Sequence, residues 1–383
     1  MQISPTHHAL RDLAMSSLAS GREIGRLLEQ NADQYQVSHR YTLAPQLNRL
    51  GLAEAWNPTP LVLADGSALY RLTVSQRCYF YEALGYIDAN LIFACPGPGM
   101  SGFVIEAIGS EAQQARFFSL FQRQLSRSCF AMSEPARGSD AGAIATQATR
   151  VAGGWLISGE KYFIGNGSIA DIGILFARTA EGPLGLNMFL FEPTKASGFS
   201  AERLPVFGVP GSAISHLRFD QMFVADDALV GAHLKPAQRF AAAALTTFDN
   251  LRPCVGALAL GVARALLDHL TSAGYLAGKR HAVWLRHTRR QLAAALAQLL
   301  TIAERMDGGE SMSRQIGLAK SQVTALVEQM LHELLHRCDP AVAGDAFFCK
   351  AWRDVKSFEY TEGTRNIHLL NASALFKSEA GYV

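Results

Sequence analysis

The stretch HELLH at residues 332–336 carries residue types that could hold a metal ion. His332 and His336 are four positions apart, so they would share one helical face, as in a zinc site where Glu333 is the general base. Glu359, further along the chain, could supply a third ligand. A five-residue match with three fixed positions is common by chance, so the pattern favours ordinary helix residues over a zinc protease and predicts no metal.

A second stretch, CFAMSEPARGSDAGA at residues 129–143, ends an apolar run in a cluster of Ser, Gly, Pro and Asp beside Glu134. Such a cluster is typical of a surface turn. It is also typical of a loop whose backbone N–H groups and hydroxyls contact the polar groups of a ligand. These residues alone leave both interpretations open.

Three regions of different character must position these stretches. Residues 1–125 carry apolar residues at mixed spacings of three and four, which predicts helices. Residues 126–233 hold short segments rich in β-branched and aromatic residues between Gly, Pro, Asn and Asp, which predicts the strands of a barrel or sandwich. Residues 234–383 return to long amphipathic patterns. The sequence therefore predicts three domains with these bounds.

Glycine and proline mark several boundaries within these regions. CPGPGM at 95–100 predicts a break between helices, and VAGG at 151–154 predicts a hairpin turn. Pro253 predicts a kink or a first-turn position in a helix. Asp339–Pro340 predicts the end of a long helix, and a last short helix is expected through TRNIHLLNASALF.

Composition excludes some classes of function. The formal charge of +2 on 383 residues gives no indication of a nucleic-acid partner, and no apolar run reaches the roughly 20 residues that a membrane span needs. The first residues lack a basic segment followed by an apolar core, so no secretion signal is expected. The six cysteines are scattered without paired spacing, which predicts free thiols in a reducing cytoplasm.

The order of regions and several motifs together resemble the acyl-CoA dehydrogenase family. FAMSEPARGSDAG is similar to that family's pattern T-E-P-x-x-G-S-D, with Ser133 in place of Thr, and ISGEKYFIGNG at 157–167 is similar to N-G-x-K-x-W-I-T-N. WRDVKSFEYTEGTRNI at 352–367 is similar to the signature R-D-x-x-x-x-x-x-x-E-G-T, and the spacing from Arg353 to Glu362 is the family's own. ADDALVG at 225–231 and FDNLRPCVGALALGVARALLD at 248–268 resemble the end of the middle domain and the start of the third.

The resemblance implies an α+β multidomain fold: a helical N-terminal domain, a middle β-barrel and a C-terminal four-helix bundle, with FAD at their junction. It implies that Glu362 is the base that removes the α-proton of an acyl thioester while the β-hydrogen leaves as hydride, giving a 2,3-enoyl thioester. Some relatives carry the base on the first long helix of the third domain. Leu251 stands there, so that alternative is absent.

The resemblance also implies the remaining site residues. Asp249 and Arg252 would orient the base loop or touch substrate, or they form a structural ion pair. Ser139 is placed for a pyrophosphate or for the phosphate of a thioester substrate. Phe163 would press on the flavin ring, whereas taken alone it is more typical of a core aromatic. The residues expected to bind FAD are Phe130, Met132, Ser133, Ser139, Phe163, Ile164, Gly165 and Thr364.

The sequence departs from the family in two loops that normally reach FAD across a dimer. An Arg-x-x-Phe-Gly motif is blurred into AGKRHAV at 277–283, and a Gly-Gly-x-Gly loop is replaced by DPAVAG at 339–344. FAD is therefore expected to be held less tightly or differently. The acyl carrier is left open between CoA and an acyl carrier protein. A homodimer or homotetramer and a separate electron acceptor are expected, and a flavin monooxygenase or a non-catalytic relative are the alternatives.

Overall fold

The computed structural model describes residues 4–135, 144–182 and 185–379. Helices dominate the chain before the sheet, and two of them begin at capping boxes, Thr73 with Gln76 and Ser110 with Gln113. These helices are α1 (Pro5–Ser16), α2 (Leu18–Gln30), α3 (Ala44–Leu50), α4 (Val74–Ile87), α5 (Asn90–Ala94), α6 (Gly99–Ile108) and α7 (Glu111–Arg123). The predicted break at 95–100 is confirmed. A small hairpin of β1 (Leu61–Val62) and β2 (Ala68–Leu69) was not expected.

The described residues of the middle region form a seven-stranded curled sheet. Its strands are β3 (Ser128–Ala131), β4 (Gln147–Val151), β5 (Gly154–Ile164), β6 (Ile172–Arg178), β7 (Leu186–Phe191), β8 (Phe199–Arg203) and β9 (Ser215–Ala225). The order is β3-β6-β4-β5-β9-β8, with β7 also paired to β6. The predicted hairpin at 151–154 is confirmed, because β4 turns into β5 through Gly153, whose φ is +74°.

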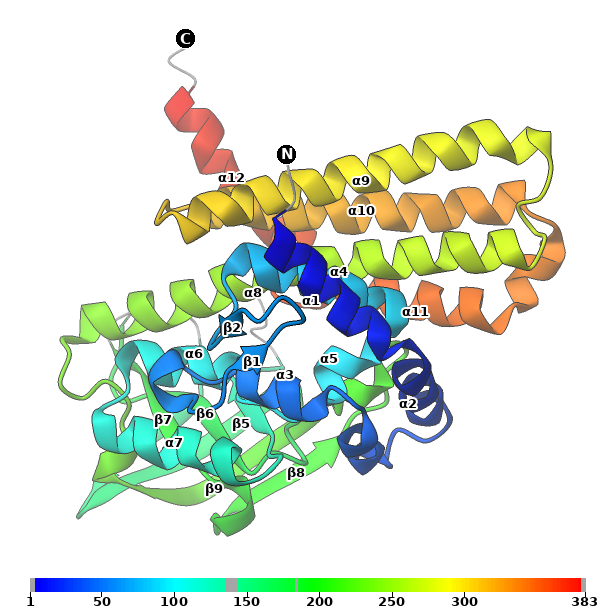
Figure 1. The fold of residues 1–383 in the computed structure, drawn as a ribbon. Helices are drawn as coiled ribbons and strands as arrows, with labels where there is room; N and C mark the ends of the chain where they lie inside the picture. Colours follow the sequence, from blue (N-terminus) through cyan, green and yellow to red (C-terminus); the bar gives the residue numbers. More distant parts are fainter. Residues whose placement is uncertain (1–3, 136–143, 183–184, 380–383) are drawn as a thin grey trace.

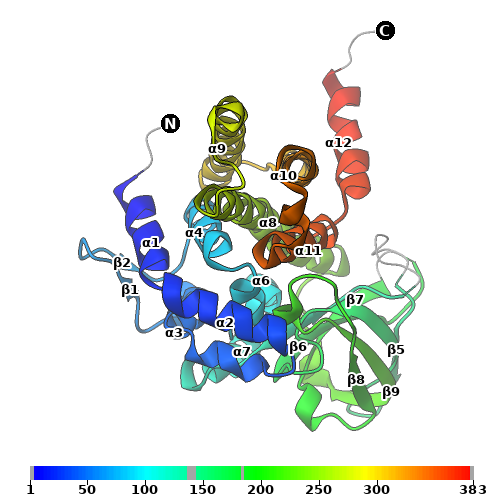
Figure 2. The ribbon, with the colours of Figure 1, turned by 90° about the vertical axis from the view of Figure 1, so that its right-hand side faces the viewer.

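Further helices follow the sheet. They are α8 (Pro236–Ser272), α9 (Lys279–Asp307), α10 (Ser313–Arg337), α11 (Ala346–Tyr360) and α12 (Arg365–Glu379). The three longest of them, α8, α9 and α10, pack side by side (Figure 1). Figure 2 shows α12 extending away from this bundle. The helix end before Pro340 and the last helix are confirmed. Pro253 lies in the interior of α8, so the first-turn alternative is wrong: the helix continues past the hydrogen bond that proline removes.

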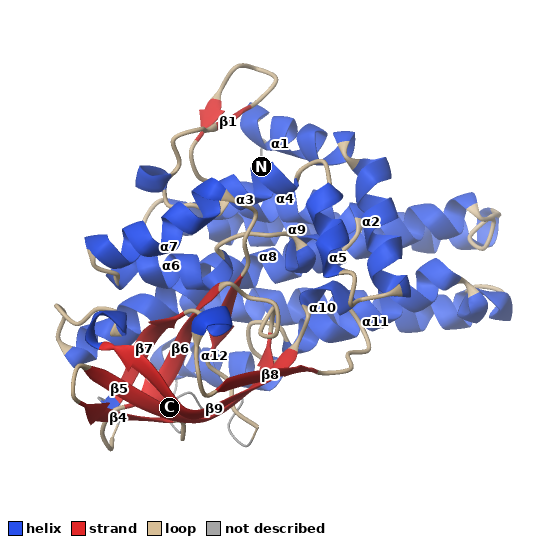
Figure 3. Cartoon of the chain, turned by 90° about the horizontal axis from the view of Figure 1, so that it is seen from below, coloured by secondary structure: helices blue, strands red, loops and turns tan. Residues whose placement is uncertain are grey.

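Helix α8 connects the helical regions, because α4 packs directly against it. A Cβ on Gly85 would lie 2.4 Å from the carbonyl oxygen of Leu258, and one on Gly261 would lie 2.0 Å from that of Glu82. Glycine at both positions lets the two backbones approach closely. The sheet lies beneath α6 and α7 at one side of the molecule (Figure 3). The chain between β8 and β9 contacts α11, because the Val209 N–H donates to Asp354 Oδ1 at 2.8 Å, and Glu362 lies in the turn after α11.

Within the described residues, one segment of α8, Thr247–Ser272, is long and apolar enough to cross a membrane, and 78% of its most apolar window is buried in the fold. Its apolar side chains belong to a core shared with α10 and α11. The six cysteines all lie in the described part of the chain, and none of them forms a disulfide there.

Candidate functional site

Glu362 lies in a strained turn between two helices. Helix α11 ends at Tyr360 and α12 begins at Arg365, and between them Glu362 and Gly363 have φ values of +59° and +103°. A side chain other than glycine is disfavoured at positive φ, so surrounding contacts must hold Glu362 there. Two cations supply them: Arg252 Nε donates to the carbonyl oxygen of Glu362 at 3.2 Å, and Lys320 Nζ donates to that of Gly363 at 2.8 Å.

The Glu362 side chain is partly buried, and its Oε2 atom is buried with no hydrogen-bond partner among the described residues. Burial raises the pKa of Glu362 to about 7, while the positive charges of Arg252 and Lys320 oppose that rise. A carboxyl group with a pKa near neutral pH, and with one oxygen free of partners, is suited to accept a proton.

Asp249 and Arg252 lie together on α8, beside this turn. Arg252 Nη1 is 3.6 Å from Asp249 Oδ1, and the Ser313 hydroxyl donates to Asp249 Oδ2. Burial raises the pKa of Asp249. The guanidinium of Arg252 thus joins Asp249 to the carbonyl oxygen of Glu362. This arrangement orients the turn, and substrate contact by either residue stays a prediction.

Glu134, the acid beside the Ser- and Gly-rich stretch, is a structural anchor that sequence reasoning missed. Its carboxylate accepts hydrogen bonds from the backbone N–H groups of Ala145 and Thr146, from the Thr146 hydroxyl, and from Lys161 Nζ at 2.8 Å. Burial alone would raise the pKa of Glu134, but the hydrogen bonds from Lys161 and Thr146 hold it below its usual range. Lys161 also donates to the carbonyl oxygen of Met132. In the sequence these two residues stand 27 positions apart, each inside one of the two motifs quoted above, and nothing in their spacing indicates that they pair.

This anchor brings together the two segments expected to bind FAD. The Tyr162 N–H donates to the carbonyl oxygen of Ser133 at 2.8 Å, so the chain after β3 runs beside the end of β5. Phe163 follows with a φ of +59°, and 67% of it is exposed, although a phenylalanine is normally buried. An exposed ring held at strained φ beside a polar backbone edge fits a planar, partly polar ligand such as a flavin.

The other expected cofactor residues lie around the same region or outside the description. The Phe130 ring packs against Phe176 at 4.9 Å and against Phe248 at 6.0 Å, one turn of α8 before Arg252. Ile164 is buried, Gly165 is partly exposed, and Thr364 follows Glu362 in its turn. Ser139 lies outside the described residues. Cofactor binding by all of these residues stays a prediction.

The HELLH residues have structural contacts instead of the geometry of a metal site. The His332 ring packs edge-on against Trp352 at 4.8 Å, and Trp284 Nε1 donates to Glu333 Oε2 at 2.6 Å. Glu359, considered as a third ligand, accepts the Arg365 N–H at the start of α12 instead. Across residues 4–135, 144–182 and 185–379, no three His, Cys, Asp or Glu residues gather so that they could hold a metal.

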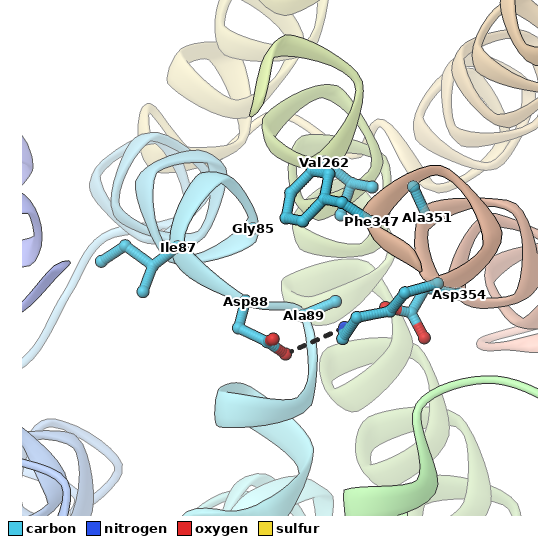
Figure 4. Close-up of a pocket in the computed structure, with 9 residues that line it drawn as sticks. Gly85, Ile87, Asp88, Ala89, Val262, Phe347, Ala351 and Asp354 are labelled. Carbon is cyan, nitrogen blue, oxygen red and sulfur yellow. Dashed lines mark hydrogen bonds and ion pairs between the residues drawn. The ribbon is translucent and has the colours of Figure 1, made fainter. Parts of the chain in front are cut away.

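Two pockets lie away from Glu362. The smaller, of about 10 Å³, sits where α4, α8 and α11 meet and is lined by Asp88, Lys350 and Asp354 (Figure 4). Lys350 Nζ lies 3.1 Å from Asp88 Oδ1 and also pairs with Asp354, so the space is about one water molecule beside a buried ion-pair cluster. The larger, of about 240 Å³, lies at the start of α7 beside Arg116 and His233.

Comparison with known proteins shows which family this chain is similar to. The family models for the acyl-CoA dehydrogenase middle domain and C-terminal domain match residues 129–222 and 241–374. The bovine mitochondrial short-chain specific acyl-CoA dehydrogenase is 28% identical over 289 residues, covering 70% of this chain and 68% of that protein. An acyl-CoA dehydrogenase of Bacillus subtilis is 34% identical over 163 residues, or 42% of each chain. The chain thus aligns with about two thirds of one relative and less than half of the other.

Solved structures share the fold along nearly the whole chain. Butyryl-CoA dehydrogenase from Megasphaera elsdenii superposes with a TM-score of 0.83 at 20% identity, covering 98% of this chain and 99% of that one. A structure described as PigA with FAD and proline gives a TM-score of 0.82 at 17% identity, covering 99% of both chains. The expected fold of helical, β and helical domains is therefore confirmed.

Proposed function

Because the chain belongs to the acyl-CoA dehydrogenase family, we propose that it oxidises an acyl thioester between its α and β carbons, giving a 2,3-enoyl thioester. The observation that carries this proposal is Glu362, whose buried Oε2 atom has no hydrogen-bond partner among the described residues and whose pKa is raised to about 7. Removal of an α-proton needs a base, and a general base is most efficient when its pKa lies near the working pH.

The proposed cofactor is FAD, which accepts the hydride leaving the β carbon when it is bound. The backbone at Met132 and Ser133 would contact the polar edge of the flavin, and the exposed Phe163 ring would lie against its face. Ile164, Gly165 and Thr364 would line the same site, with Phe130 packed behind it. This assignment is supported by the Glu134–Lys161 anchor, because that pair holds both segments together.

Glu362 then takes the α-proton onto its carboxylate, while Arg252 and Lys320 keep the turn in place through its carbonyl groups. Asp249 holds Arg252 in position on α8. We propose CoA as the carrier of the acyl group because the curated relatives are named for acyl-CoA. We further propose that the protein passes its electrons to a separate acceptor, that it forms a homo-oligomer and that it works in a reducing cytoplasm.

The experiment that tests this function is anaerobic mixing of the purified protein with acyl-CoA thioesters of different chain length, followed by absorption spectroscopy. We expect flavin bands that bleach with at least one thioester, and release of FAD on denaturation. The same acyl group on a carrier protein is the matched comparison, because faster bleaching there would assign the carrier. Bound FMN, or bound FAD that no acyl thioester reduces, would contradict the proposal.

The pH dependence of that reduction follows from the base. Glu362 works as a carboxylate, and its pKa is raised to about 7, so the rate should rise as pH increases through about 7 and level off above it. Stopped-flow measurement of flavin bleaching between pH 5.5 and about 8.5 checks this. Circular dichroism over the same range controls for unfolding. A rate that stays constant across this range would show that another group removes the proton.

A further inference from the structure

Lys320 is a buried cation that contacts the backbone on both sides of Glu362. It lies on α10 with none of its surface exposed, and its ammonium donates to the carbonyl oxygens of Glu359 at 3.0 Å and Gly363 at 2.8 Å. Within the part of the chain that the structure describes, no carboxylate lies within 4.0 Å of this ammonium. A buried charge is costly unless its surroundings compensate it, so this arrangement requires a reason.

The two carbonyl groups lie on either side of Glu362. Glu359 is in the last turn of α11, where carbonyl groups lack helical partners and a cation is favourable. Gly363 is the second residue at positive φ in the turn. One ammonium therefore ties the end of α11 to the residue after the base, across the strained position itself.

The face of α10 that carries Lys320 is shaped for this contact. A Cβ at Gly317, one turn earlier, would lie 2.7 Å from Nδ1 of His368, so glycine leaves room for that ring from α12. A Cβ at Gly363 would lie 3.0 Å from the same ring. The close packing of α10, the turn and the first part of α12 leaves the Lys320 side chain little freedom to move.

Titratable groups on α8, α10, α11 and α12 lie close to the turn that carries Glu362. The positive charges of Arg252 on α8 and Lys320 on α10 act on Glu362 itself. Asp249 on α8 acts on Arg252, Glu359 on α11 and Arg365 on α12 act on Lys320, and His368 on α12 is acted on by both cations. Burial lowers the pKa of His368 to about 4, so this ring is neutral near pH 7. Arg252 is paired with Asp249, and Glu359 lies beside Arg365. Among the residues that the structure describes, Lys320 is the cation of this group that makes no ion pair of its own within 4.0 Å.

We propose that Lys320 is a positioning residue for Glu362, because its ammonium ties both sides of the strained turn and its positive charge favours the carboxylate form of the base. The inference rests on the proposed function for its consequence in catalysis. The contacts that carry it depend only on the fold.

The test is infrared spectroscopy of the Glu362 carboxyl group in the flavin-loaded protein without substrate. The protonated acid has a carbonyl band that Glu362→Gln removes, which assigns it. In the parent this band should disappear with a midpoint near pH 7. Removal of an adjacent positive charge favours the protonated form, so Lys320→Met should move the midpoint upward by about one pH unit or more. The pH profile of flavin reduction should move by the same amount.

Two further variants keep the test decisive. Lys320→Gln retains a hydrogen-bond donor but removes the positive charge. It should therefore shift the midpoint while disturbing the turn less than Lys320→Met does. It also replaces Lys320→Met in the test if that variant does not fold. Lys356→Met removes an ammonium that pairs α11 with Glu328 of α10 but does not contact the turn, and it should leave the midpoint unchanged. Hydrogen exchange at residues 359–368 that is faster in Lys320→Met but unchanged in Lys356→Met would support the positioning role.

If the midpoint pH of the Glu362 band is the same in folded Lys320→Met and Lys320→Gln as in the parent, the inference is overturned. Failure of the proposed function has a different signature. In that case Glu362→Gln would reduce its flavin at the parent rate, while the midpoint would still shift in the Lys320 variants.

Discussion

Glu362→Gln should fold, retain FAD and bind substrate, yet reduce its flavin about 10²–10⁴-fold more slowly than the parent. Glutamine keeps the size and the hydrogen-bonding groups of glutamate but cannot accept the proton. The backbone contacts from Arg252 and Lys320 reach carbonyl oxygens, so they do not depend on the substituted side chain. Anaerobic stopped-flow mixing with the best acyl thioester measures the effect.

Glu333→Gln is the matched control, because Glu333 is the acid that a zinc protease would use. Its carboxylate accepts from Trp284 on α9 and from Gln329 on α10, and not from the turn that carries Glu362, so this variant should reduce flavin at the parent rate. If Glu333→Gln were slow and Glu362→Gln were not, the base would be assigned wrongly. Equal rates for Glu362→Gln and the parent would place the base elsewhere in the site.

The second large effect is expected at the buried pair of Glu134 and Lys161. These side chains are 6% and 0% exposed, and Glu134→Gln would leave the Lys161 ammonium buried without its anion. Removing one partner of a buried ion pair typically costs about 3–5 kcal/mol in the free energy of unfolding. Urea denaturation at pH 7 measures the loss. Weaker FAD binding is expected with it, because Lys161 also holds the carbonyl oxygen of Met132.

Two companion variants distinguish this effect from a general weakness of the sheet. The double variant Glu134→Gln with Lys161→Met should regain part of the lost stability, since no unpaired charge stays buried. Glu202→Gln removes an exposed ion pair with Arg218 between β8 and β9 and should cost at most about 1 kcal/mol. A Glu134→Gln cost as small as that of Glu202→Gln would mean that the buried pair does not anchor the loop.

The sequence by itself determined features that depend on local chemistry. Proline restricts φ and glycine permits positive φ wherever they occur, so the break at 95–100, the hairpin at 151–154 and the end of α10 were predictable. The motif from Arg353 to Glu362 is contiguous, so its resemblance could be recognised without knowing the fold. The regions of helix and strand followed from periodicity, except that the β1–β2 hairpin is too short to produce a pattern.

Only the tertiary structure decided which residues surround Glu362 and what the local patterns mean. The ammonium of Lys320 donates to the carbonyl oxygens of Glu359 and Gly363, about forty residues further along the chain. The ammonium of Lys161 on β5 donates to the carboxylate of Glu134, which follows β3. Such contacts leave no trace in local spacing, because each partner alone resembles an ordinary charged residue. HELLH is the opposite case, because its two histidines have the spacing of a zinc site in the sequence. They could bind a metal only if the fold brought a third ligand beside them. Pro253 likewise stays inside α8 because packing against neighbouring helices outweighs the loss of one backbone hydrogen bond.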